Sequence, residues 1–446
     1  MRNEFKSILF LTALIIVAVI ISGCTSQQSP QGTTQTVNNT IKIGVIASMS
    51  GPASTTGKDI WQSAQLAADE INSQGGVYLK DIGKKALIQL VLGDDESTRE
   101  GGQKAVSKLI TQDKVDLLVG GFSSAVVSAH QAIVADNKIP YIIAGASSTQ
   151  VSKRKDIDNT YLFYHRPNTD NSAEASLLFL NDTVRPAINS KFGFPDSRPL
   201  RVAVVYQDSP FGKGQLDAVN NLTKKLNLPI VVVANASFKM GESDFRTTLT
   251  SVKSQNPDVI YAVTFLNELI PLTQQAIRDV GLKTLILSIE NNDDPDYYKG
   301  VGQVADYSVM ESRFSPYAIP NTSTKERTTK FLSDFDTKYQ GFAGMMGAAT
   351  YESVYIAKNA IENAGSTDKV KVKDALSSGS VDQLLETMKD GKIIFSPDTH
   401  ESKFDLFVSQ MRMDNKTNEI RPHIVWPVSL QETSFVLPDW YAPGTT

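Results

Sequence analysis

Short apolar segments alternate with stretches of helical apolar spacing along this chain of 446 residues, and this alternation constrains the fold more than any other feature. The apolar segments are short enough for strands, and the stretches between them repeat apolar residues every three or four positions. The strands expected in the first part are 41–46, 87–92, 115–119 and 139–143, and the helices are 60–71, 102–112 and 124–137. Strands that alternate with helices predict a parallel sheet covered by helices on both faces.

The same pattern returns in the second part of the chain. Here the expected strands are 202–206, 230–234, 259–263 and 285–288, and the expected helices are 214–226, 245–255 and 268–280. Three of these strands follow their counterparts at a distance of roughly 145 residues, which is far longer than the period of a solenoid repeat. The repetition therefore predicts an α/β protein with two tandem lobes.

After residue 310 the order of the elements changes. The helices expected here are 325–339, 342–364 and 368–377, and the strands are 392–395, 404–413 and 423–427. The second of these helices is rich in Ala, Met and Tyr, so we expect most of it to be buried. We expect these elements to return to the two lobes and complete them.

The N-terminus is typical of a secretion signal. Arg2 and Lys6 precede an apolar run at 8–21, which is too short for a comfortable transmembrane helix of about 20 residues. The run ends in Ile21-Ser-Gly-Cys24, which resembles a lipobox, the signal for lipid attachment to the cysteine. A plain signal peptide with a chance cysteine and a short anchor helix stay open as alternatives.

Residues 1–23 are therefore expected to be a lipoprotein signal peptide, with Cys24 as the lipidation site. Residues 24–40 follow, and they are polar and nearly uncharged, so they cannot bury enough apolar surface to fold. We expect this segment to be a flexible tether between a membrane anchor and a soluble body. The expected location is extracytoplasmic, on the cell-surface or periplasmic face of the cell membrane.

Composition excludes several classes of function. The net charge is −4, so no basic excess attracts nucleic acid. Cys24 is the only cysteine, which excludes an internal disulfide framework and Cys-rich metal sites. His130, His165, His400 and His423 lack the spacing of a metal site, so we expect no metal and no cofactor. His130 falls within an expected helix and is predicted to be a half-buried packing residue.

Two serine-rich turns each follow a strand and open a helix, at 120–124 and 144–149. Ligands of open α/β sheets bind at the carboxyl ends of strands, and helix N-termini there favour a carboxylate. The hydroxyls of Ser124 and Ser148 could add donors to such a site. The other interpretation, that these serines only cap their helices, stays open.

A secreted serine hydrolase is a further alternative. Gly121-Phe-Ser123-Ser-Ala125 resembles the G-x-S-x-G turn of a nucleophilic serine, although Ala replaces the last Gly. His165, His400 or His423 could in principle serve Ser123, but no pairing of Asp with His is visible in the sequence. An enzyme is therefore not expected.

Several short motifs together resemble the type I periplasmic binding proteins, and among them the leucine/isoleucine/valine-binding proteins of ABC importers. The order and spacing of the motifs carry this resemblance over about 41–407. The motifs are IKIGVIASMSGP at 41–52, AADEINSQGG at 67–76, GDDES at 93–97, VGGFSSAVVSA at 119–129, IPYIIAGASS at 139–148, RVAVVYQDSPFGKG at 201–214 and GLKTLILSIE at 281–290.

The resemblance implies two Rossmann-like three-layer lobes with a ligand cleft between them and a hinge. We expect the first lobe to contain 41–163 plus about 314–391. The second lobe would then contain 164–313 plus about 392–446. A ligand that contacts both lobes would couple binding to a hinge motion.

The resemblance also implies the residues of the binding site. Ser124, the backbone of Ala146, and Ser148 would bind the α-carboxylate of an amino acid. Glu290, in the second lobe, would accept from the α-ammonium group.

Aromatic residues are implied around the ligand's side chain. Phe211 and Phe265 occupy positions that are Tyr in typical amino-acid binders, so two hydroxyls are missing and the pocket is expected to be more apolar. Thr56 falls near the position of the first loop that faces the ligand, where an aromatic residue is common.

The function implied by the resemblance is that of a lipid-anchored solute receptor of an ABC importer, not an enzyme. It would bind a small amino acid, branched-chain or aliphatic, and deliver it to a membrane permease driven by a cytoplasmic ATPase. A binding or sensor protein for an amide, urea or aromatic acid stays open as the alternative.

Overall fold

Two β-sheets form the framework of the protein in the computed structural model, which describes residues 40–289, 294–414 and 418–443. The predicted signal peptide, the tether up to residue 39 with Cys24, and Glu290 lie outside the described residues. In the described part of the chain, no helix has both the length and the apolar composition that a membrane crossing requires.

The first sheet has six strands in the order β2-β3-β1-β4-β5-β6, and only the pair β2–β3 is antiparallel. Ile43 and Val45 of β1 pack into the core on one face, and Ile46 packs into the core on the other. This burial on both faces is the pattern expected of a central parallel strand. The strands are β1 (Thr40–Ala47), β2 (Val77–Leu79), β3 (Lys84–Asp94), β4 (Leu117–Gly120), β5 (Tyr141–Ile143) and β6 (Leu162–Tyr164).

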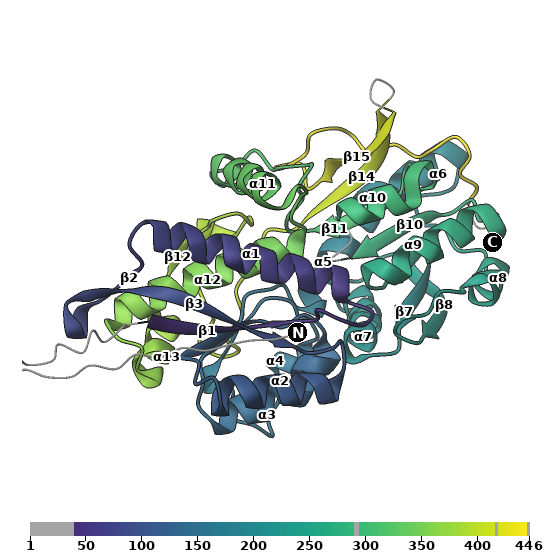
Figure 1. The fold of residues 1–446 in the computed structure, drawn as a ribbon. Helices are drawn as coiled ribbons and strands as arrows, with labels where there is room; N and C mark the ends of the chain where they lie inside the picture. The colour runs from purple at the N-terminus through teal and green to yellow at the C-terminus, as the bar shows by residue number, and fades with distance from the viewer. Residues whose placement is uncertain (1–39, 290–293, 415–417, 444–446) are drawn as a thin grey trace, which may run out of the picture. The chain divides into compact units, whose positions relative to one another are not determined.

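Helices from two distant parts of the chain cover the first sheet. α1 and α12 lie on one face and α2 and α3 on the other (Figure 1). α11 packs on α1, α13 packs on α12, and α12 is buried over most of its length, as its composition predicts. The helices are α1 (Ser54–Ser73), α2 (Arg99–Thr111), α3 (Ser124–Asp136), α4 (Thr149–Ser152), α11 (Lys325–Tyr339), α12 (Met345–Ala364) and α13 (Lys369–Ser378).

The second sheet has seven strands in the order β15-β14-β11-β10-β9-β7-β8. The strands from β8 to β11 are parallel, and the hairpin of β14 and β15 adds two antiparallel strands at one edge. The C-terminal hairpin therefore completes this sheet. The strands are β7 (Leu200–Gln207), β8 (Ile230–Phe238), β9 (Val259–Val263), β10 (Leu285–Ile289), β11 (Val309–Ser312), β14 (Phe407–Asp414) and β15 (Glu419–Trp426).

Alternate residues of β7 point into two different cores. Val202 and Val204 pack in the same core as residues of α5 and α7, whereas Ala203 and Val205 pack with residues of α8, α9 and α10. The helices are α5 (Thr169–Phe179), α6 (Arg185–Phe192), α7 (Pro210–Lys225), α8 (Arg246–Ser254), α9 (Leu266–Gln274) and α10 (Pro295–Val301). The short strands β12 (Val381–Asp382) and β13 (Lys392–Ile393) form a separate antiparallel pair.

Three segments connect the elements around one sheet to those around the other. The first crossover, 165–168, joins β6 to α5. The second crossover, 313–324, joins β11 to α11, and the third, 394–406, joins β13 to β14. The structure thus has two sheet-containing α/β lobes, whose residue boundaries stay a prediction.

The predicted alternation of strands and helices is confirmed, and helix 325–339 and strand 259–263 have the predicted bounds. The elements that the sequence pattern did not predict include α5, α6, β6 and β11. α5 lacks a clear apolar stripe because it buries small polar residues such as Ser172 and Ser176 beside Leu177. His130 in α3 is fully buried, so the prediction of half-burial was wrong.

Candidate functional site

Turns at the carboxyl ends of strands in both sheets border one small cavity. This is where the ligands of open α/β sheets bind. The cavity has a volume of about 10 Å³, which is room for one water molecule at most. It is lined by Phe122, Ser124, Gly145, Ser147, Phe211, Thr264 and Phe265.

Two consecutive glycines turn the chain at the end of β4. Gly120 has φ of +91° and Gly121 has φ of +81°, which is the left-handed region that favours glycine. A Cβ atom on Gly121 would lie 2.0 Å from the hydroxyl of Tyr141. The turn can therefore form only with glycine, and it brings Phe122 to the cavity and Ser124 to the first turn of α3.

The two predicted serines meet at the first lobe's side of the cleft. The backbone N–H of Ser148 donates to Ser124 Oγ at 3.2 Å. Ser148 Oγ in turn accepts from the backbone N–H of Gln150 at 3.3 Å and caps α4, which is one of the two interpretations left open by the sequence. Ser124 lines the cavity, whereas Ser147 takes the place predicted for Ser148.

Ala146 is fully buried and lies beside the cavity lining. Its backbone N–H donates to the carbonyl of Gly121 at 3.3 Å. Its carbonyl accepts from Arg166 Nε at 2.8 Å. Both backbone groups are therefore engaged, and the N–H reaches a ligand only if its bond to Gly121 opens.

Three phenylalanine rings form the apolar wall of the cavity. The ring centroids of Phe122, from the first lobe, and Phe265, from the second, are 4.6 Å apart. Phe211 stacks on Phe265 at 6.0 Å. Near these rings, the side-chain amide of Asn267 donates across the cleft to the carbonyl of Pro52 at 2.5 Å. Phe122 was not predicted as a site residue, although it lies within the quoted motif at 119–129.

Two buried hydroxyls next to these rings have no hydrogen-bond partner among the described residues, those of Thr264 and Ser123. Thr264 is fully buried and lines the cavity immediately before Phe265. The rule that places ligands at strand ends could have found Thr264, because it follows β9 directly. No hydrogen bond joins Ser123 to a histidine within the described chain, so the arrangement of a hydrolase is not formed there.

The other predicted residues are not part of the cavity lining. Thr56 is buried in the first turn of α1. Glu290 and Cys24 lie outside the described residues. Of the seven predicted ligand contacts, the structure brings Ser124, Phe211 and Phe265 to the cavity.

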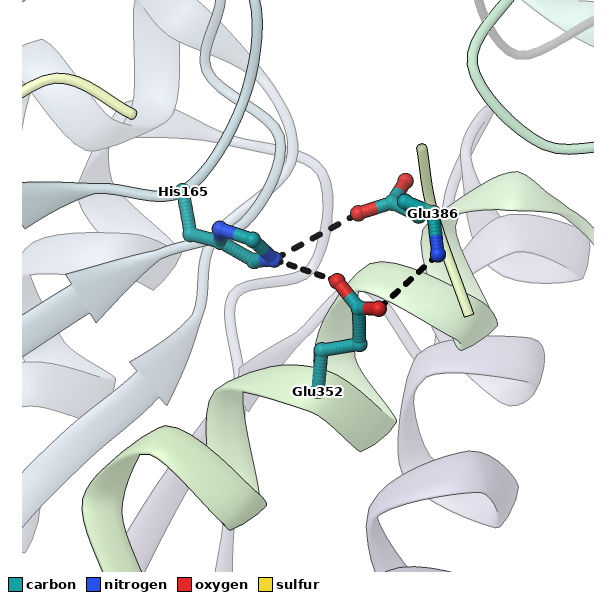
Figure 2. A group of neighbouring side chains, drawn as sticks. All are labelled: His165, Glu352 and Glu386. Carbon is teal, nitrogen blue, oxygen red and sulfur yellow. Dashed lines mark hydrogen bonds and ion pairs between the residues drawn. The ribbon is translucent and has the colours of Figure 1, made fainter. Parts of the chain in front are cut away.

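A second group of polar side chains lies outside this lining (Figure 2). His165, Glu352 and Glu386 are fully buried, and they offer one nitrogen and two oxygens within 4.8 Å of one another. Within the described residues this group has the composition of a metal site. Sequence spacing could not reveal it, since His165 and Glu352 are 187 residues apart.

Comparison with known proteins agrees with the fold. The model of the periplasmic binding protein family matches residues 40–417. The Leu/Ile/Val-binding protein BraC3 of Rhizobium johnstonii is 26% identical over 341 residues, which cover 76% of this chain and 84% of that relative.

Solved structures with the same fold have different ligands. The branched-chain amino acid transporter substrate binding protein LivJ of Streptococcus pneumoniae, in complex with isoleucine, has a TM-score of 0.70 and 23% identity, covering 87% of this chain and 100% of that one. A solute binding protein of an ABC transporter from R. palustris, in complex with benzoate, has a TM-score of 0.69 and 16% identity, covering 89% of this chain and 99% of that one.

Proposed function

The chain belongs to the periplasmic binding protein family, and from this premise we propose that it is the solute receptor of an ABC importer for a branched-chain or aliphatic amino acid. The observation that carries the proposal is the cavity between the lobes. Hydroxyls of Ser124 and Ser147 meet phenyl rings of Phe211 and Phe265 there, as a ligand with a carboxylate and an apolar side chain requires.

The three rings support an apolar ligand side chain. Phe211 and Phe265 lack the hydroxyls of tyrosine, and Phe122 adds a third ring from the opposite lobe. An aliphatic side chain of the ligand would contact these rings in place of their contacts with one another. The cleft would then stay apolar when the lobes close around the ligand. The hydroxyl of Thr264, which has no partner in the described chain, is available to the polar end of the ligand.

Glu290 is proposed to accept from the ligand's ammonium group. Isothermal titration of the purified protein with L-leucine, L-isoleucine and L-valine tests both the ligand class and this residue. Glu290→Ala should abolish binding and leave thermal unfolding unchanged, whereas the exposed Glu326→Ala serves as the matched control and should bind normally. Unchanged affinity in Glu290→Ala would contradict the assignment of the ammonium group.

An aromatic acid is the second candidate ligand, because the cavity wall consists of three phenyl rings. A thermal-shift screen separates the two classes. A ligand at a hundred times its dissociation constant should raise the free energy of unfolding by about 2.7 kcal/mol. Stabilisation by benzoate but not by L-leucine would favour the aromatic acid.

We further propose that the protein is extracytoplasmic and held at the membrane by a lipid on Cys24. In this position it would deliver its ligand to a permease driven by a cytoplasmic ATPase. Cys24→Ala should move the protein from the membrane fraction to the soluble fraction. Retention in the membrane fraction would favour an anchor helix.

A further inference from the structure

Ionisable side chains gather where the three crossovers meet, and all are buried or nearly so. We call them the hinge cluster. Two arginines, one histidine and three glutamates make up the cluster: His165 and Arg166 in the first crossover, Arg313 in the second, Glu401 in the third, Glu352 in α12, and Glu386 after β12. Because buried ions are stable only when they are paired, the contacts within this cluster constrain the hinge.

His165 is the centre of the cluster. Its Nε2 lies 2.6 Å from Glu352 Oε2 and 3.4 Å from Glu386 Oε2 (Figure 2). The other oxygen of Glu352 accepts from the backbone N–H groups of Leu385 and Glu386, at 2.5 and 2.9 Å. The carboxylate of Glu352 is thereby fixed between the helix α12 and the segment after β12.

Arg313 connects this centre to the binding turn 144–148. Its Nε lies 2.8 Å from Glu386 Oε1, and its Nη2 donates to the carbonyl of Ala144 at 2.9 Å. Its guanidinium also lies over the ring of Phe404 from the third crossover. One side chain of the second crossover therefore contacts the third crossover and the start of the binding turn.

Arg166 makes a parallel connection. Its Nε donates to the carbonyl of Ala146 at 2.8 Å, and its Nη1 donates to Glu401 Oε1 at 3.0 Å. Glu401 also accepts from Ser152 Oγ at 2.6 Å and from the amide of Asn168 at 3.0 Å. Both arginines of the hinge cluster thus bind carbonyls of the binding turn, those of Ala144 and Ala146. Ser147, the residue after Ala146, lines the cavity.

The charges of the hinge cluster balance only when one proton is added. Two arginines face three glutamates, so the cluster is one positive charge short unless it holds a proton, either on His165 as an imidazolium or on the carboxyl of Glu386. A short hydrogen bond between His165 and Glu352 is the geometry expected of a charge-assisted pair.

A divalent cation is the competing way to supply positive charge, since an imidazole and two carboxylates can ligate a metal. It would leave the cluster with an excess positive charge. The separation of 2.6 Å between His165 Nε2 and Glu352 Oε2 is a hydrogen-bond distance, and both side chains are fully buried. The geometry therefore favours the proton.

We propose that the hinge cluster is a proton-dependent positioning device, in which His165 holds the crossovers together and fixes the binding turn 144–148. His165 is a positioning residue, because it acts on the cleft through Arg313 and the turn. The effect on ligand affinity rests on the proposed function, whereas the effect on the turn itself does not.

Each element packed against His165 contributes a side chain that faces it. Glu352 faces it from α12, Glu386 from the segment after β12, and Arg313 from the second crossover. The third crossover contributes uncharged groups, namely Ser402 Oγ at 3.3 Å from Nδ1 and the ring of Phe404.

The direction of the pH dependence follows from these neighbours. Burial lowers the pKa of His165, but the hydrogen bond to Glu352 and the negative charges of Glu352 and Glu386 outweigh burial, so this pKa lies above its ordinary value. Burial raises the pKa of Glu386 to about 7, against the attraction of Arg313. A raised pKa in the folded state means that stabilisation is present below the ordinary value and is lost as pH rises through the raised value. Both groups therefore weaken the cluster on the alkaline side.

The test compares His165→Gln, Glu386→Gln and the double variant with the wild type at about pH 6.5 and about pH 8.5. His165→Gln keeps a hydrogen-bonding side chain but removes the proton site. Glu386→Gln removes one negative charge, so the double variant restores the balance without a titrating histidine. His130→Gln is the matched control, because His130 is equally buried and lies outside the cluster.

The main readout is hydrogen-exchange protection of amides in residues 144–152, corrected for intrinsic exchange. Protection in the wild type should be lower at the higher pH. If opening of the turn releases one proton, protection should fall about tenfold with each pH unit. His165→Gln should be less protected than the wild type and less dependent on pH, and the double variant should recover protection at both pH values. His130→Gln should follow the wild type. Equal pH dependence in His165→Gln and the wild type, or no recovery in the double variant, would overturn the proposal.

Two further measurements separate the alternatives. The affinity for L-leucine should follow the protection of the turn; if no amino acid binds, the proposed function fails while the exchange experiment still decides on the hinge cluster. Elemental analysis of the purified protein tests the metal. Stoichiometric zinc in the wild type that is absent from His165→Gln would overturn the assignment of a proton.

Discussion

Two histidines of this protein are equally buried, and their surroundings move their pKa values in opposite directions. His130 lies in α3, inside the first lobe, and neither ring nitrogen has a hydrogen-bond partner among the described residues. Burial lowers its pKa to about 3. His165 lies in the first crossover between two carboxylates, which raise its pKa despite burial. The difference shows that partners, and not burial alone, decide whether a buried histidine carries charge.

The comparison also separates two kinds of interior. The core around His130 is held by apolar contacts, for which a neutral ring that fills space is sufficient. The hinge cluster is held by ions, and each ion there depends on the others. Substitutions in these two regions are therefore expected to change the free energy of unfolding by very different amounts.

The largest effect is expected from Arg313→Met, which removes a cation from the hinge cluster. Glu386 would remain buried without its ion pair to Arg313, and breaking a buried pair costs about 3–5 kcal/mol. Urea denaturation of the purified protein measures the loss. Arg246→Met, which breaks exposed ion pairs with Asp244 and Asp279, is the control and should change the free energy of unfolding little. A similar loss in the two variants would contradict the role of Arg313.

A smaller effect is expected at His130 in acid. Its pKa in the folded state is lower than in the unfolded chain, so the unfolded chain takes up the proton first and stability falls as pH decreases from about 6.5 towards 3. This residue should therefore lower the free energy of unfolding by about 2–3 kcal/mol at about pH 4.5. His130→Gln should lack this part of the acid loss. Parallel curves of stability against pH for the two proteins would show that His130 does not titrate as described.

Glu352→Gln should make His165 more like His130. Removing the negative charge at 2.6 Å should lower the pKa of His165. An NMR titration of the imidazole Cε1–H follows this pKa directly. Glu352→Asp keeps the charge and should retain most of the raised pKa, whereas an unchanged pKa in Glu352→Gln would assign the effect to Glu386 alone.

The smallest effect on stability is expected from Thr264→Val. The hydroxyl of Thr264, like the ring of His130, has no partner in the described chain, so its removal should leave the free energy of unfolding unchanged or raise it by up to about 1 kcal/mol. Affinity for L-leucine should fall about threefold to tenfold if the ligand uses this hydroxyl.

A hydrogen-bonded threonine provides the control for Thr264→Val. Thr328 is buried and donates to the carbonyl of Leu385 at 3.2 Å. Thr328→Val should lose about 1 kcal/mol of stability and bind L-leucine normally. A loss of stability in Thr264→Val equal to that in Thr328→Val would mean that the Thr264 hydroxyl has a partner in solution.

The fold was largely predictable because it depends on local patterns. The apolar run at 259–263 and the spacing of Phe331 and Phe335 each report a single strand or helix, and strand ends then indicate the cleft. α5 was missed because a helix buried around small polar residues has no apolar stripe to detect.

The details of the sites depend on tertiary contacts, which local patterns do not encode. Ser124 could be placed at the cleft because it follows a strand, but its bond from Ser148 required the two turns to meet. His165 and Glu352 are brought together by a crossover and a returning helix. The sequence could not indicate that one buried histidine has two carboxylate neighbours and another has none.

The small cavity has a consequence for the kinetics of capture. Since its volume of about 10 Å³ admits one water molecule at most, a solute of amino-acid size reaches it only while the lobes are apart. The ring contact between Phe122 and Phe265 and the hydrogen bond from Asn267 to Pro52 must open first. The observed association rate is then the encounter rate multiplied by the open fraction of molecules. Contacts across the cleft in the ligand-free protein thus slow capture, and they do so separately from the chemistry of the pocket.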